Sequence, residues 1–411
     1  MAFEKKTIRI IGAGFSGLTC AYYLVKAGFE VEVIEKSGRV GGLLGTMKTP
    51  YGLVETAANA FLNSQALMDL AKEIDLTLLM PKRESRARFV FRGKATRFPV
   101  RLKEMFSLVR FLFKMIFSRK SLLPSAHESL RHWGVRALGA NLSHYSIETA
   151  LQGIYAGNPE KLSANLVLQS FFKTKKSAVP TGSRAPRNGM SEFIDKLQSY
   201  LKLKGVKFTL GQEAEVFKEV SRPTVLALPA YESATLIENI EPDLARHLSQ
   251  VDYLPIITAN IFFDQSNISL QGFGCLFAPE ESNLVLGVLI NHSIFENRSK
   301  NAASEKWIMG GAFVKNRREF IAKSDHEVIE MALAKRRFIK PTGISDVLDA
   351  KITRWPKAFP AYTLELETLL PKLTPQNKNI FLHGNYLGDL GLTKILDRSA
   401  RLAEQIKAAY A

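Results

Sequence analysis

The stretch TIRIIGAGFSG, residues 7–17, decides the fold of this chain. Its first five residues are mostly β-branched and apolar, which is typical of a buried parallel strand. The three glycines that follow precede Leu18 to Ala27, which we expect to form a helix. In such a turn the first glycine permits the tight bend, the second lets backbone N–H groups approach a diphosphate, and the third lets the helix pack against the strand. The helix N-terminus adds partial positive charge for the phosphates.

A second group of residues supports a dinucleotide site. Glu30 to Ile34 predicts the next strand, and Glu35, 23 residues after Gly12, lies where a carboxylate can accept hydrogen bonds from a ribose. That acid disfavours the 2′-phosphate of NADP. Residues 39–42, RVGG, add a glycine loop with Arg39 available for the diphosphate. We therefore predict a Rossmann-like site for FAD rather than NAD.

The composition is that of a folded protein with more than one domain. The chain has 411 residues, of which 46% are hydrophobic and 23% charged, which allows two or three domains around a large core. Its two cysteines, Cys20 and Cys275, fit neither a disulfide framework nor a metal site, and this favours a reducing compartment. His127 and His132 would not share a helix face, so we expect no metal site. No segment reaches 18 uninterrupted apolar residues, so we expect no spanning helix.

The positive charge is concentrated around one apolar segment. The net charge is +17, and residues 82–120 hold thirteen Lys and Arg against two Glu. Residues 105–117, MFSLVRFLFKMIF, are apolar with sparse cations, whereas nucleic-acid binders rarely pair their charge with such a run. We therefore expect a helix that lies on an anionic membrane surface, and no nucleic-acid partner. The alternative is a core helix whose cations extend to the surface.

Hydrophobic periodicity and turn residues predict the remaining elements. Residues 121–175 are expected to be mainly helical, and residues 173–187 to form an exposed boundary loop. A further helix is expected at Met190 to Leu203. Strands are expected at Val206 to Leu210, Glu213 to Phe217, Thr224 to Leu228, Ile256 to Phe263, Leu284 to Ile290 and Trp307 to Phe313, the last three in a mixed or antiparallel sheet.

The C-terminal tail repeats the pattern of the start. Asn379 to His383 predicts a short strand, and residues 384–388 a glycine loop. Gly391 and Leu392 then open a predicted helix that runs to about Ala409. Such a helix N-terminus would place partial positive charge near a flavin ring and stabilise its anionic reduced form. His383, beside this loop, is either a proton relay or a structural histidine, and we favour the structural role.

Several segments together resemble the protoporphyrinogen oxidase family, within the larger superfamily of amine-oxidase-like flavoproteins. YAGNPEKLS at residues 155–163 is similar to that family's YAG-(D/N)-P-x-x-LS stretch. QGFGCL at residues 271–276, followed by Pro279, Glu281 and Leu286-Gly287, is similar to a block of its substrate domain. RWPKA at residues 354–358, followed by Pro360 and Tyr362, is similar to a third segment. The similarities occur in order over nearly the whole chain.

The resemblance implies an FAD-dependent oxidation of protoporphyrinogen IX to protoporphyrin IX. Hydride would pass to flavin N5, with oxygen or another acceptor taking the electrons, and the cofactor would carry most of the chemistry. Cys275 is not placed for a covalent flavin link, so we expect non-covalent FAD. The protein would be cytoplasmic and peripherally associated with the inner face of the membrane, and a homodimer is an open alternative. Other candidate functions are a flavin amine oxidase, a carotenoid desaturase-like oxidoreductase, and a non-catalytic flavin- or porphyrin-binding protein.

The expected fold is α/β, with a Rossmann-like FAD-binding domain of the glutathione-reductase type, a mixed-sheet substrate domain, and a basic helical membrane-docking domain. The FAD-binding domain is discontinuous and takes residues 1–80, 186–235 and 376–411. The substrate-binding domain takes residues 81–97 and 236–375. The helical, membrane-associating domain takes residues 98–185.

The motifs and the resemblance together give the candidate site residues. The resemblance places residues 57–60 where the family has a glycine-proline turn near the flavin, Ala214 beside the adenine, and residues 390–392 where backbone approaches the isoalloxazine. It also offers Lys103, or its neighbour Arg101, as the cation for the substrate's propionates. No catalytic residue is assigned. The predicted cofactor-binding residues are Gly12, Ala13, Gly14, Phe15, Ser16, Gly17, Glu35, Lys36, Arg39, Gly41, Gly42, Ala57, Ala58, Asn59, Ala60, Ala214, Gly384, Asn385, Leu390, Gly391 and Leu392.

Overall fold

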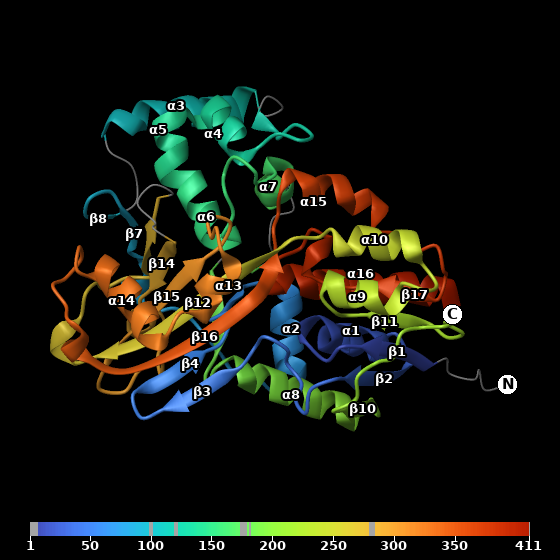
Figure 1. The fold of residues 1–411 in the computed structure, drawn as a ribbon. Coiled ribbons are helices and arrows are strands. Elements are labelled where there is room, and N and C mark those ends of the chain that lie inside the picture. Colours follow the sequence, from blue (N-terminus) through green and yellow to red (C-terminus); the bar gives the residue numbers. More distant parts are fainter. Residues whose placement is uncertain are drawn as a thin grey trace.

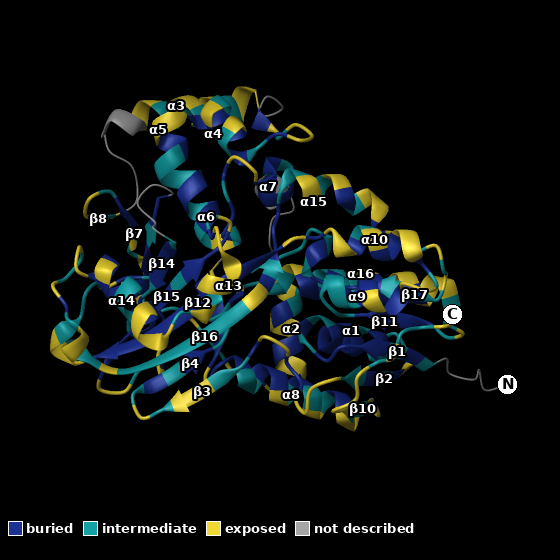
Figure 2. Ribbon diagram, viewed as in Figure 1, coloured by how far each residue is buried: buried dark blue, intermediate teal, exposed yellow. Residues whose placement is uncertain are grey.

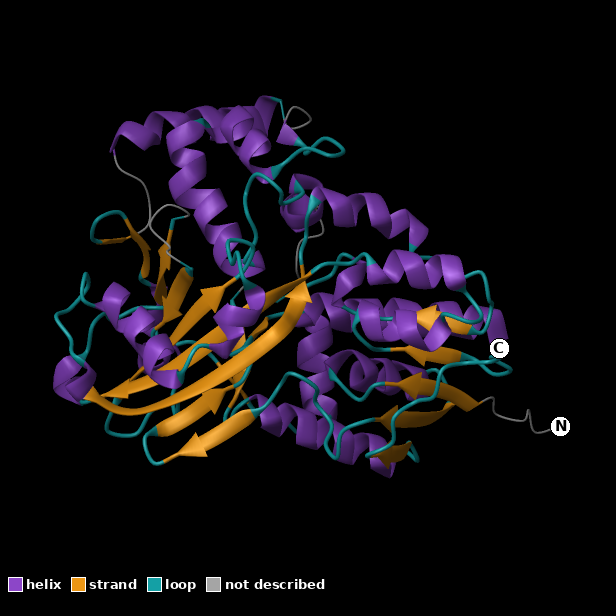
Figure 3. Cartoon of the chain, in the orientation of Figure 1, coloured by secondary structure: helices purple, strands orange, loops and turns teal. Residues whose placement is uncertain are grey.

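The computed structural model describes residues 7–97, 102–118, 122–172, 179–180, 182–278 and 284–410. Figure 1 shows a parallel sheet among helices on one side of the molecule, a larger sheet beside it, and a group of helices at one end. The two sheets differ in character: short strands alternate with helices around the first, whereas the second contains the longest strands of the molecule (Figure 3). The chain therefore has a mixed α/β fold, as predicted.

The first sheet has five parallel strands, in the order β10-β2-β1-β11-β17. Their carboxyl ends lie at one edge, because Ile11 pairs with both Ile34 and Leu226, and Leu226 pairs with Leu382. Segments more than 200 residues apart in the sequence are thus brought to the same edge. The strands are β1 (Thr7–Ile11), β2 (Glu30–Glu35), β10 (Lys207–Leu210), β11 (Thr224–Leu226) and β17 (Ile380–Leu382).

Three long helices cover this sheet and share its core. They are α1 (Phe15–Lys26), α8 (Met190–Leu203) and α16 (Leu392–Tyr410). Their apolar residues form one cluster with those of the strands, such as Leu18 of α1, Leu197 of α8 and Leu396 of α16, all fully buried. The bounds of α8 and α16 agree with the sequence prediction, and α1 begins earlier than expected, directly after Gly14.

The second sheet has seven strands, in the order β16-β12-β15-β14-β13-β7-β8. All neighbours are antiparallel except β13 and β7, which makes the sheet mixed. Alternate residues of β12, next to the edge strand β16, such as Ile257 and Ile261, pack with α14 (Asp325–Arg336) in a separate core. The strands are β7 (Arg88–Phe91), β8 (Ala95–Arg97), β12 (Tyr253–Phe263), β13 (Gly274–Phe277), β14 (Val285–Leu289), β15 (Ala303–Gly310) and β16 (Val347–Pro360).

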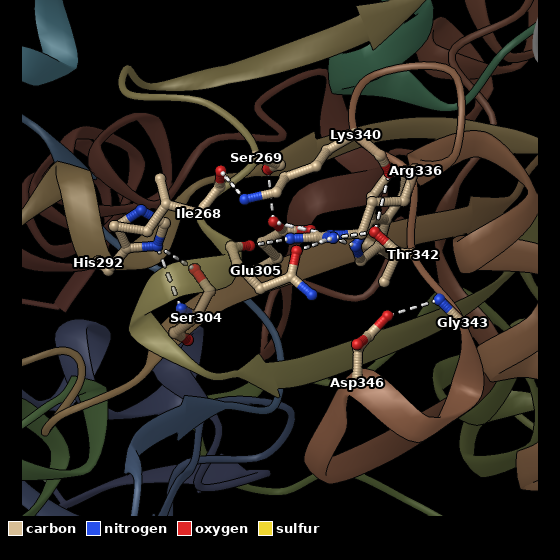
Figure 4. Close-up of polar contacts among 12 residues, drawn as sticks. Ile268, Ser269, His292, Ser304, Glu305, Arg336, Lys340, Thr342, Gly343 and Asp346 are labelled. Carbon is tan, nitrogen blue, oxygen red and sulfur yellow. Dashed lines mark hydrogen bonds and ion pairs between the residues drawn. The ribbon is translucent and has the colours of Figure 1, made fainter.

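A buried ion pair ties β15 to α14 within this core (Figure 4). The Arg336 Nε donates to both carboxylate oxygens of Glu305, at 3.1 and 3.0 Å, and both side chains are fully buried. Glu305 also accepts from Ser269 and Trp307, at 2.5 and 3.1 Å. The guanidinium of Arg336 lies 3.8 Å from the ring centre of Phe263. Because each charge has several partners, the pair is compensated in the absence of water.

The helical group forms the outer end of the molecule. It contains α3 (Leu102–Phe117), α4 (Leu130–Leu138), α5 (Ala140–Ser143), α6 (Thr149–Tyr155) and α7 (Ala164–Phe172), with a π-helical stretch at His144–Glu148 between α5 and α6. Figure 2 shows that much of α3 is exposed at this end. None of the helices within the described ranges is long and apolar enough to cross a bilayer.

Two strand predictions differ from the structure. Residues 213–217 form no strand, because β10 and β11 lie on opposite sides of β1 and β2, so the connecting chain must cross the end of the sheet. The predicted strand from Trp307 to Phe313 is instead Ala303–Gly310. It ends where Gly310 and Gly311 take positive φ angles of 117° and 87°, which turn the backbone out of the sheet.

Shorter elements connect these layers. The remaining strands are β3 (Thr46–Thr49), β4 (Gly52–Glu55), β5 (Phe61–Leu62), β6 (Leu78–Leu79) and β9 (Ser183–Pro186), and the remaining helices with six or more residues are α2 (Gln65–Glu73), α9 (Ala230–Ile237), α10 (Pro242–Ser249), α13 (Arg317–Ala322) and α15 (Leu364–Leu369).

Candidate functional site

A cavity of about 940 Å³ lies at the carboxyl edge of the first sheet. It is bounded by the turns that follow β1, β11 and β17, represented by Gly12, Leu228 and Gly384. It continues to the helical group, where Leu151 and Tyr155 of α6 line it. Ligands of open α/β sheets bind outside the carboxyl ends of the strands, and the volume is that of a site for a large ligand.

The glycine turn after β1 is built for a ligand on one side and for packing on the other. A Cβ at Gly17 would lie 1.9 Å from the carbonyl oxygen of Gly12, so only glycine lets α1 pack here. A Cβ at Gly14 would meet nothing closer than the Cα of Gly42, at 3.9 Å. The protein itself therefore leaves room for a side chain at Gly14, and the glycine keeps a cradle open at the cavity. The first turn of α1 carries no acid, which suits an anion such as a diphosphate.

Glu35 connects the end of β2 to the glycine turn. Its Oε2 accepts a hydrogen bond from the backbone N–H of Ala13 at 2.8 Å. Its Oε1 accepts from the N–H and hydroxyl of Ser37, at 2.9 and 2.8 Å. Glu35 also lines the cavity, and a carboxylate has further lone pairs that could accept ribose hydroxyls. The residue thus fits both a structural and a ligand-binding role.

Arg39 makes its hydrogen bonds within its own loop. Its guanidinium donates to the carbonyl oxygens of Gly42, Val40 and Leu44, at 2.8, 3.2 and 3.3 Å. Gly41 and Gly42 of the same loop line the cavity, whereas Arg39 does not. In this structure the arginine shapes the loop, and its predicted contact with the diphosphate stays a prediction.

The loop of residues 55–60 faces the cavity with its alanines and the second sheet with its polar groups. Ala57, Ala58 and Ala60 line the cavity. The side chain of Asn59 is turned away, and it donates to Asn291 Oδ1 at 2.7 Å and accepts from Lys306 Nζ at 2.9 Å. The indole of Trp355 donates to the Thr56 carbonyl at 2.9 Å.

The C-terminal tail closes the other side of the cavity. Gly384, Asn385 and residues 390–392 line it, and α16 begins there without an acid in its first turn. Ala214 lines it too. His383 does not, because it is fully buried behind the loop, with Nε2 2.8 Å from the hydroxyl of Ser399. Burial lowers the pKa of His383 to about 3, which keeps its imidazole neutral.

Most of the predicted cofactor-binding residues converge on this one cavity. Ala13, Gly17, Arg39 and Asn59 do not line it. Ala13, Gly17 and Arg39 each contact a residue that does, and Asn59 belongs to the lining loop of residues 55–60 but points its side chain to Asn291 and Lys306. Arg101, one of the two predicted propionate ligands, lies outside the described residues, and Lys103 lies in α3 without a described side chain.

Sequence reasoning missed several residues of the cavity wall. One of them is Glu232 of α9, which forms an ion pair of 3.0 Å with the predicted residue Lys36. This hydrogen bond raises the pKa of Lys36. Lys357 lies 3.8 Å over the ring of Tyr231. Tyr155 and Lys357 fall within the quoted YAGNPEKLS and RWPKA segments, so the motifs gave a signal for them. Glu232 and Tyr231 carry no such signal, because only the fold brings α9 to the cavity.

Within the described residues, no group of three or more His, Cys, Asp or Glu side chains could hold a metal ion. Burial raises the pKa of the Cys20 and Cys275 thiols to about 12, so both are poor nucleophiles near neutral pH. Neither cysteine lines the cavity.

Comparisons with known proteins agree with this site. Protoporphyrinogen oxidase from chloroplasts of Nicotiana tabacum is 26% identical over 97% of this chain and 84% of its own length. Coproporphyrinogen III oxidase of Bacillus subtilis (strain 168) is 21% identical over 97% of both chains. A crystal structure from Exiguobacterium sp. 255-15, which carries a provisional assignment as a protoporphyrinogen oxidase, superposes with a TM-score of 0.81 at 19% identity and covers 98% of this chain and 99% of that one.

A family model gives the assignment. Residues 15–390 match the model of the flavin containing amine oxidoreductases. This range includes the α1 N-terminus, the loop of residues 55–60 and the tail up to Leu390, which are the segments that surround the cavity. The chain therefore belongs to the flavin containing amine oxidoreductase family and is an FAD-dependent oxidoreductase.

Proposed function

We propose that this protein oxidises a porphyrinogen, with protoporphyrinogen IX as the first candidate and coproporphyrinogen III as the second. The observation that carries the proposal is the continuity of the cavity. One space extends from Gly14 at the predicted diphosphate end to Leu151, Ile154 and Tyr155 of the helical group. The relatives named for these two activities align over 97% of the chain, so the similarity includes both the cofactor segments and the helical group.

The residues of the chain would bind and orient the reactants. Gly12, Gly14 and the N-terminus of α1 would hold the diphosphate, and Glu35 the ribose. Residues 57–58 and 390–392 would flank the isoalloxazine. When bound, FAD supplies a two-electron acceptor, so three rounds would account for the six electrons that separate a porphyrinogen from a porphyrin. Leu151, Ile154 and Val167 give the substrate end apolar walls that would exclude water.

A substrate with carboxylates needs a cation near this cavity. Lys103, with Arg101 beside it, stays our proposal for the propionates, on the resemblance that suggested it. Lys357 is a second candidate that the cavity lining adds, because it faces the ring of Tyr231 and has no carboxylate partner among the described residues. The electron acceptor would be oxygen or another oxidant.

Anaerobic reduction of the bound flavin tests the substrate. The purified protein should carry FAD, and protoporphyrinogen IX or coproporphyrinogen III should bleach the oxidised flavin band and yield a fluorescent porphyrin. Putrescine serves as the amine comparator, because a putrescine oxidase also shares the fold, with a TM-score of 0.72 at 17% identity. Bleaching by the amine alone would favour an amine oxidase. A flavin that none of the three reduces would favour a binding protein without turnover.

We further propose that α3 docks on the anionic inner face of the cytoplasmic membrane. One face of this helix, with Leu108, Phe111 and Met115, packs on the core of the helical group. The opposite face carries large apolar residues that are exposed, and much of α3 has the exposed colour at the outer end of the molecule (Figure 2). Contiguous exposed apolar surface of this kind marks an interaction site, and nearby cations favour anionic lipid. The exposed residues are Met105, Phe106, Val109, Leu112, Phe113, Ile116 and Phe117, which are 48–78% exposed.

Liposome sedimentation tests the docking. Phe106→Asp and Ile116→Asp should each reduce binding to vesicles with anionic lipid, and Arg110→Glu with Lys114→Glu should weaken it in a salt-dependent way. Leu203→Asp is the matched control, because Leu203 is 88% exposed at the end of α8, in the sheet region of the molecule (Figure 1). Equal sedimentation of all variants would overturn the docking proposal. Binding to neutral and anionic vesicles alike would overturn its electrostatic part.

The same proposal divides the chain into three functional parts. Residues 1–80, 186–235 and 376–411 would form the FAD-binding domain, of the glutathione-reductase type. Residues 81–97 and 236–375 would form the substrate-binding domain, and residues 98–185 the membrane-associating one. The strand order of the first sheet supports the first part, since all five of its strands come from those three ranges.

A further inference from the structure

A buried lysine lies behind the loop of residues 55–60, on the side away from the cavity. Lys306 of β15 is 1% exposed. Its Nζ donates to the carbonyl oxygens of Glu55, at 2.8 Å, and of Ala57, and to Asn59 Oδ1 at 2.9 Å. An ammonium group has three donors, so every one of them is used on this loop. A neutral amine has only two N–H groups and could not make all three bonds.

The contacts of Lys306 hold the loop that forms one wall of the cavity. The carbonyl of Ala57 and the side chain of Asn59 are held from behind, while Ala57 and Ala58 line the cavity. The methyl groups that face the cavity cannot themselves fix the backbone by hydrogen bonds. The shape of this part of the wall therefore depends on Lys306, with Trp355 holding the intervening carbonyl of Thr56.

The charge of Lys306 is only partly compensated. The acid that interacts with it is Glu55, whose carboxylate accepts from Met190 N, at 3.1 and 3.2 Å, and from Thr46 Oγ1 at 2.8 Å. Arg298, also buried, interacts with the same acid and with Glu192, so Glu55 interacts with two cations. Burial raises the pKa of Glu55 and lowers that of Lys306 to about 8, which Glu55 opposes. Because the site is poorly solvated, the positive charge has a strong electrostatic interaction with neighbouring groups.

We propose that Lys306 is a positioning residue of the cofactor site, which holds the 55–60 loop against the flavin and places a positive charge behind it. This inference rests on the proposed location of the isoalloxazine beside residues 57–58. Lys306 then has two measurable effects. It raises the affinity for FAD by fixing the loop, and it raises the reduction potential of the bound flavin, because a nearby cation favours the anionic reduced form over the neutral oxidised one.

The test uses the full-length protein with Lys306→Met, which keeps an unbranched side chain one atom shorter than lysine and removes the charge. The dissociation constant for FAD should rise by about tenfold or more, since charge-assisted hydrogen bonds within the site are lost. The midpoint potential of the bound flavin should become more negative. Lys351→Met is the matched control, because Lys351 and Lys306 flank Asn260 from opposite sides in the same sheet, and Lys351 pairs with Asp349 instead of the loop. The control should leave both quantities near the wild-type values.

The outcomes separate this inference from the proposed function. A wild-type protein that fails to bind FAD would defeat the proposed function itself. A Lys306→Met protein that folds and has the wild-type midpoint potential would overturn the inference, even with weaker FAD binding, because a merely structural lysine would act on affinity alone. Should Lys306→Met fail to fold, Asn59→Ala decides, since it removes one acceptor of Lys306 without burying an unpaired charge. It should weaken FAD binding because the loop loses one of its contacts with Lys306, whereas the midpoint potential should stay near the wild-type value because Lys306 keeps its charge. Wild-type FAD affinity in Asn59→Ala would overturn the inference.

Discussion

The Glu35 carboxylate accepts a hydrogen bond of 2.8 Å from the backbone N–H of Ala13. The acid at the end of β2 thus holds the middle of the glycine turn at the end of β1. Two parts of the motif that sequence reasoning treats as separate ligand contacts are physically joined. The same carboxylate group also accepts from Ser37, so the loss of its oxygens would leave several donors without partners.

Substitution of Glu35 should therefore affect both stability and cofactor binding. Glu35→Ala should lower the free energy of unfolding by about 1–3 kcal/mol, the cost of unsatisfied donors, and should weaken FAD binding. Glu35→Gln keeps one acceptor oxygen and should lie between this variant and the wild type. Chemical denaturation and FAD titration measure the two effects. Glu30→Ala is the control, since Glu30 is exposed at the start of the same strand. Unchanged FAD affinity in Glu35→Ala would contradict the ribose assignment.

Substitution of Gly14 and substitution of Gly17 should affect different properties, FAD binding in the first case and stability in the second. Gly17→Ala should destabilise the protein by about 1–3 kcal/mol, because its Cβ would lie 1.9 Å from the Gly12 carbonyl oxygen and α1 would have to move. Gly14→Ala should leave the stability of the apoprotein near wild type, since the space around its Cβ is open. If that space holds the diphosphate, Gly14→Ala should still weaken FAD binding severely. Thermal unfolding of the apoproteins and FAD titration separate the two. A Gly14→Ala protein with normal affinity would place the diphosphate elsewhere.

The buried pair of Glu305 and Arg336 should be far more sensitive than an exposed pair. Arg336→Met leaves the Glu305 charge buried with only neutral donors, and it should cost about 3–5 kcal/mol of stability. The double variant Arg336→Met with Glu305→Leu removes both charges and should recover part of that loss. Arg317→Ala breaks a two-bond pair with Asp252 on the surface and should cost no more than about 1 kcal/mol. Denaturant unfolding gives all three values, and equal losses for Arg336→Met and Arg317→Ala would refute the argument.

The features that the sequence predicted well are local ones. The strand, glycine turn and helix at the N-terminus lie within 20 consecutive residues, so their spacing alone carries the information. The same is true of β17 and the start of α16 at the other end. Their placement around one cavity followed from a general rule, that parallel strands end at a common edge. The motif therefore predicted most of the cavity wall on the side of the first sheet.

Features that depend on tertiary contact could not be predicted in this way. We expected a strand to begin at Trp307, which left Lys306 outside it and its buried contacts unsuspected. Arg39 has the sequence position of a diphosphate ligand, yet its guanidinium is used by carbonyls of its own loop. The ion pair of Glu232 with Lys36 joins residues 196 positions apart, and no periodicity carries that information. For Lys306 and Lys36 the partner is supplied by a distant part of the chain, whereas Arg39 finds its partners within five residues.

His383 should make stability depend on pH in the acid range. Burial, with a smaller contribution from the charges of Arg398 and Arg401, lowers its pKa to about 3, whereas an unfolded histidine titrates near about 6.5. Between these two values the unfolded state binds a proton that the folded state does not, so stability rises with pH through this window and is lost as the pH falls. The loss should be up to about 1.4 kcal/mol per pH unit for this one proton.

Comparison with a variant isolates this effect from other titrating groups. His383→Gln can still form a hydrogen bond with the hydroxyl of Ser399, as the imidazole does through Nε2, but it cannot take up a proton. The difference in unfolding free energy between wild type and His383→Gln should therefore shrink, or reverse in favour of the variant, as the pH falls from 7 to about 4. His326→Gln, at an exposed position of α14, should show no such trend. Parallel pH profiles for wild type and His383→Gln would mean that the imidazole is protonated in the folded protein, and would restore His383 as a candidate proton relay beside the flavin loop.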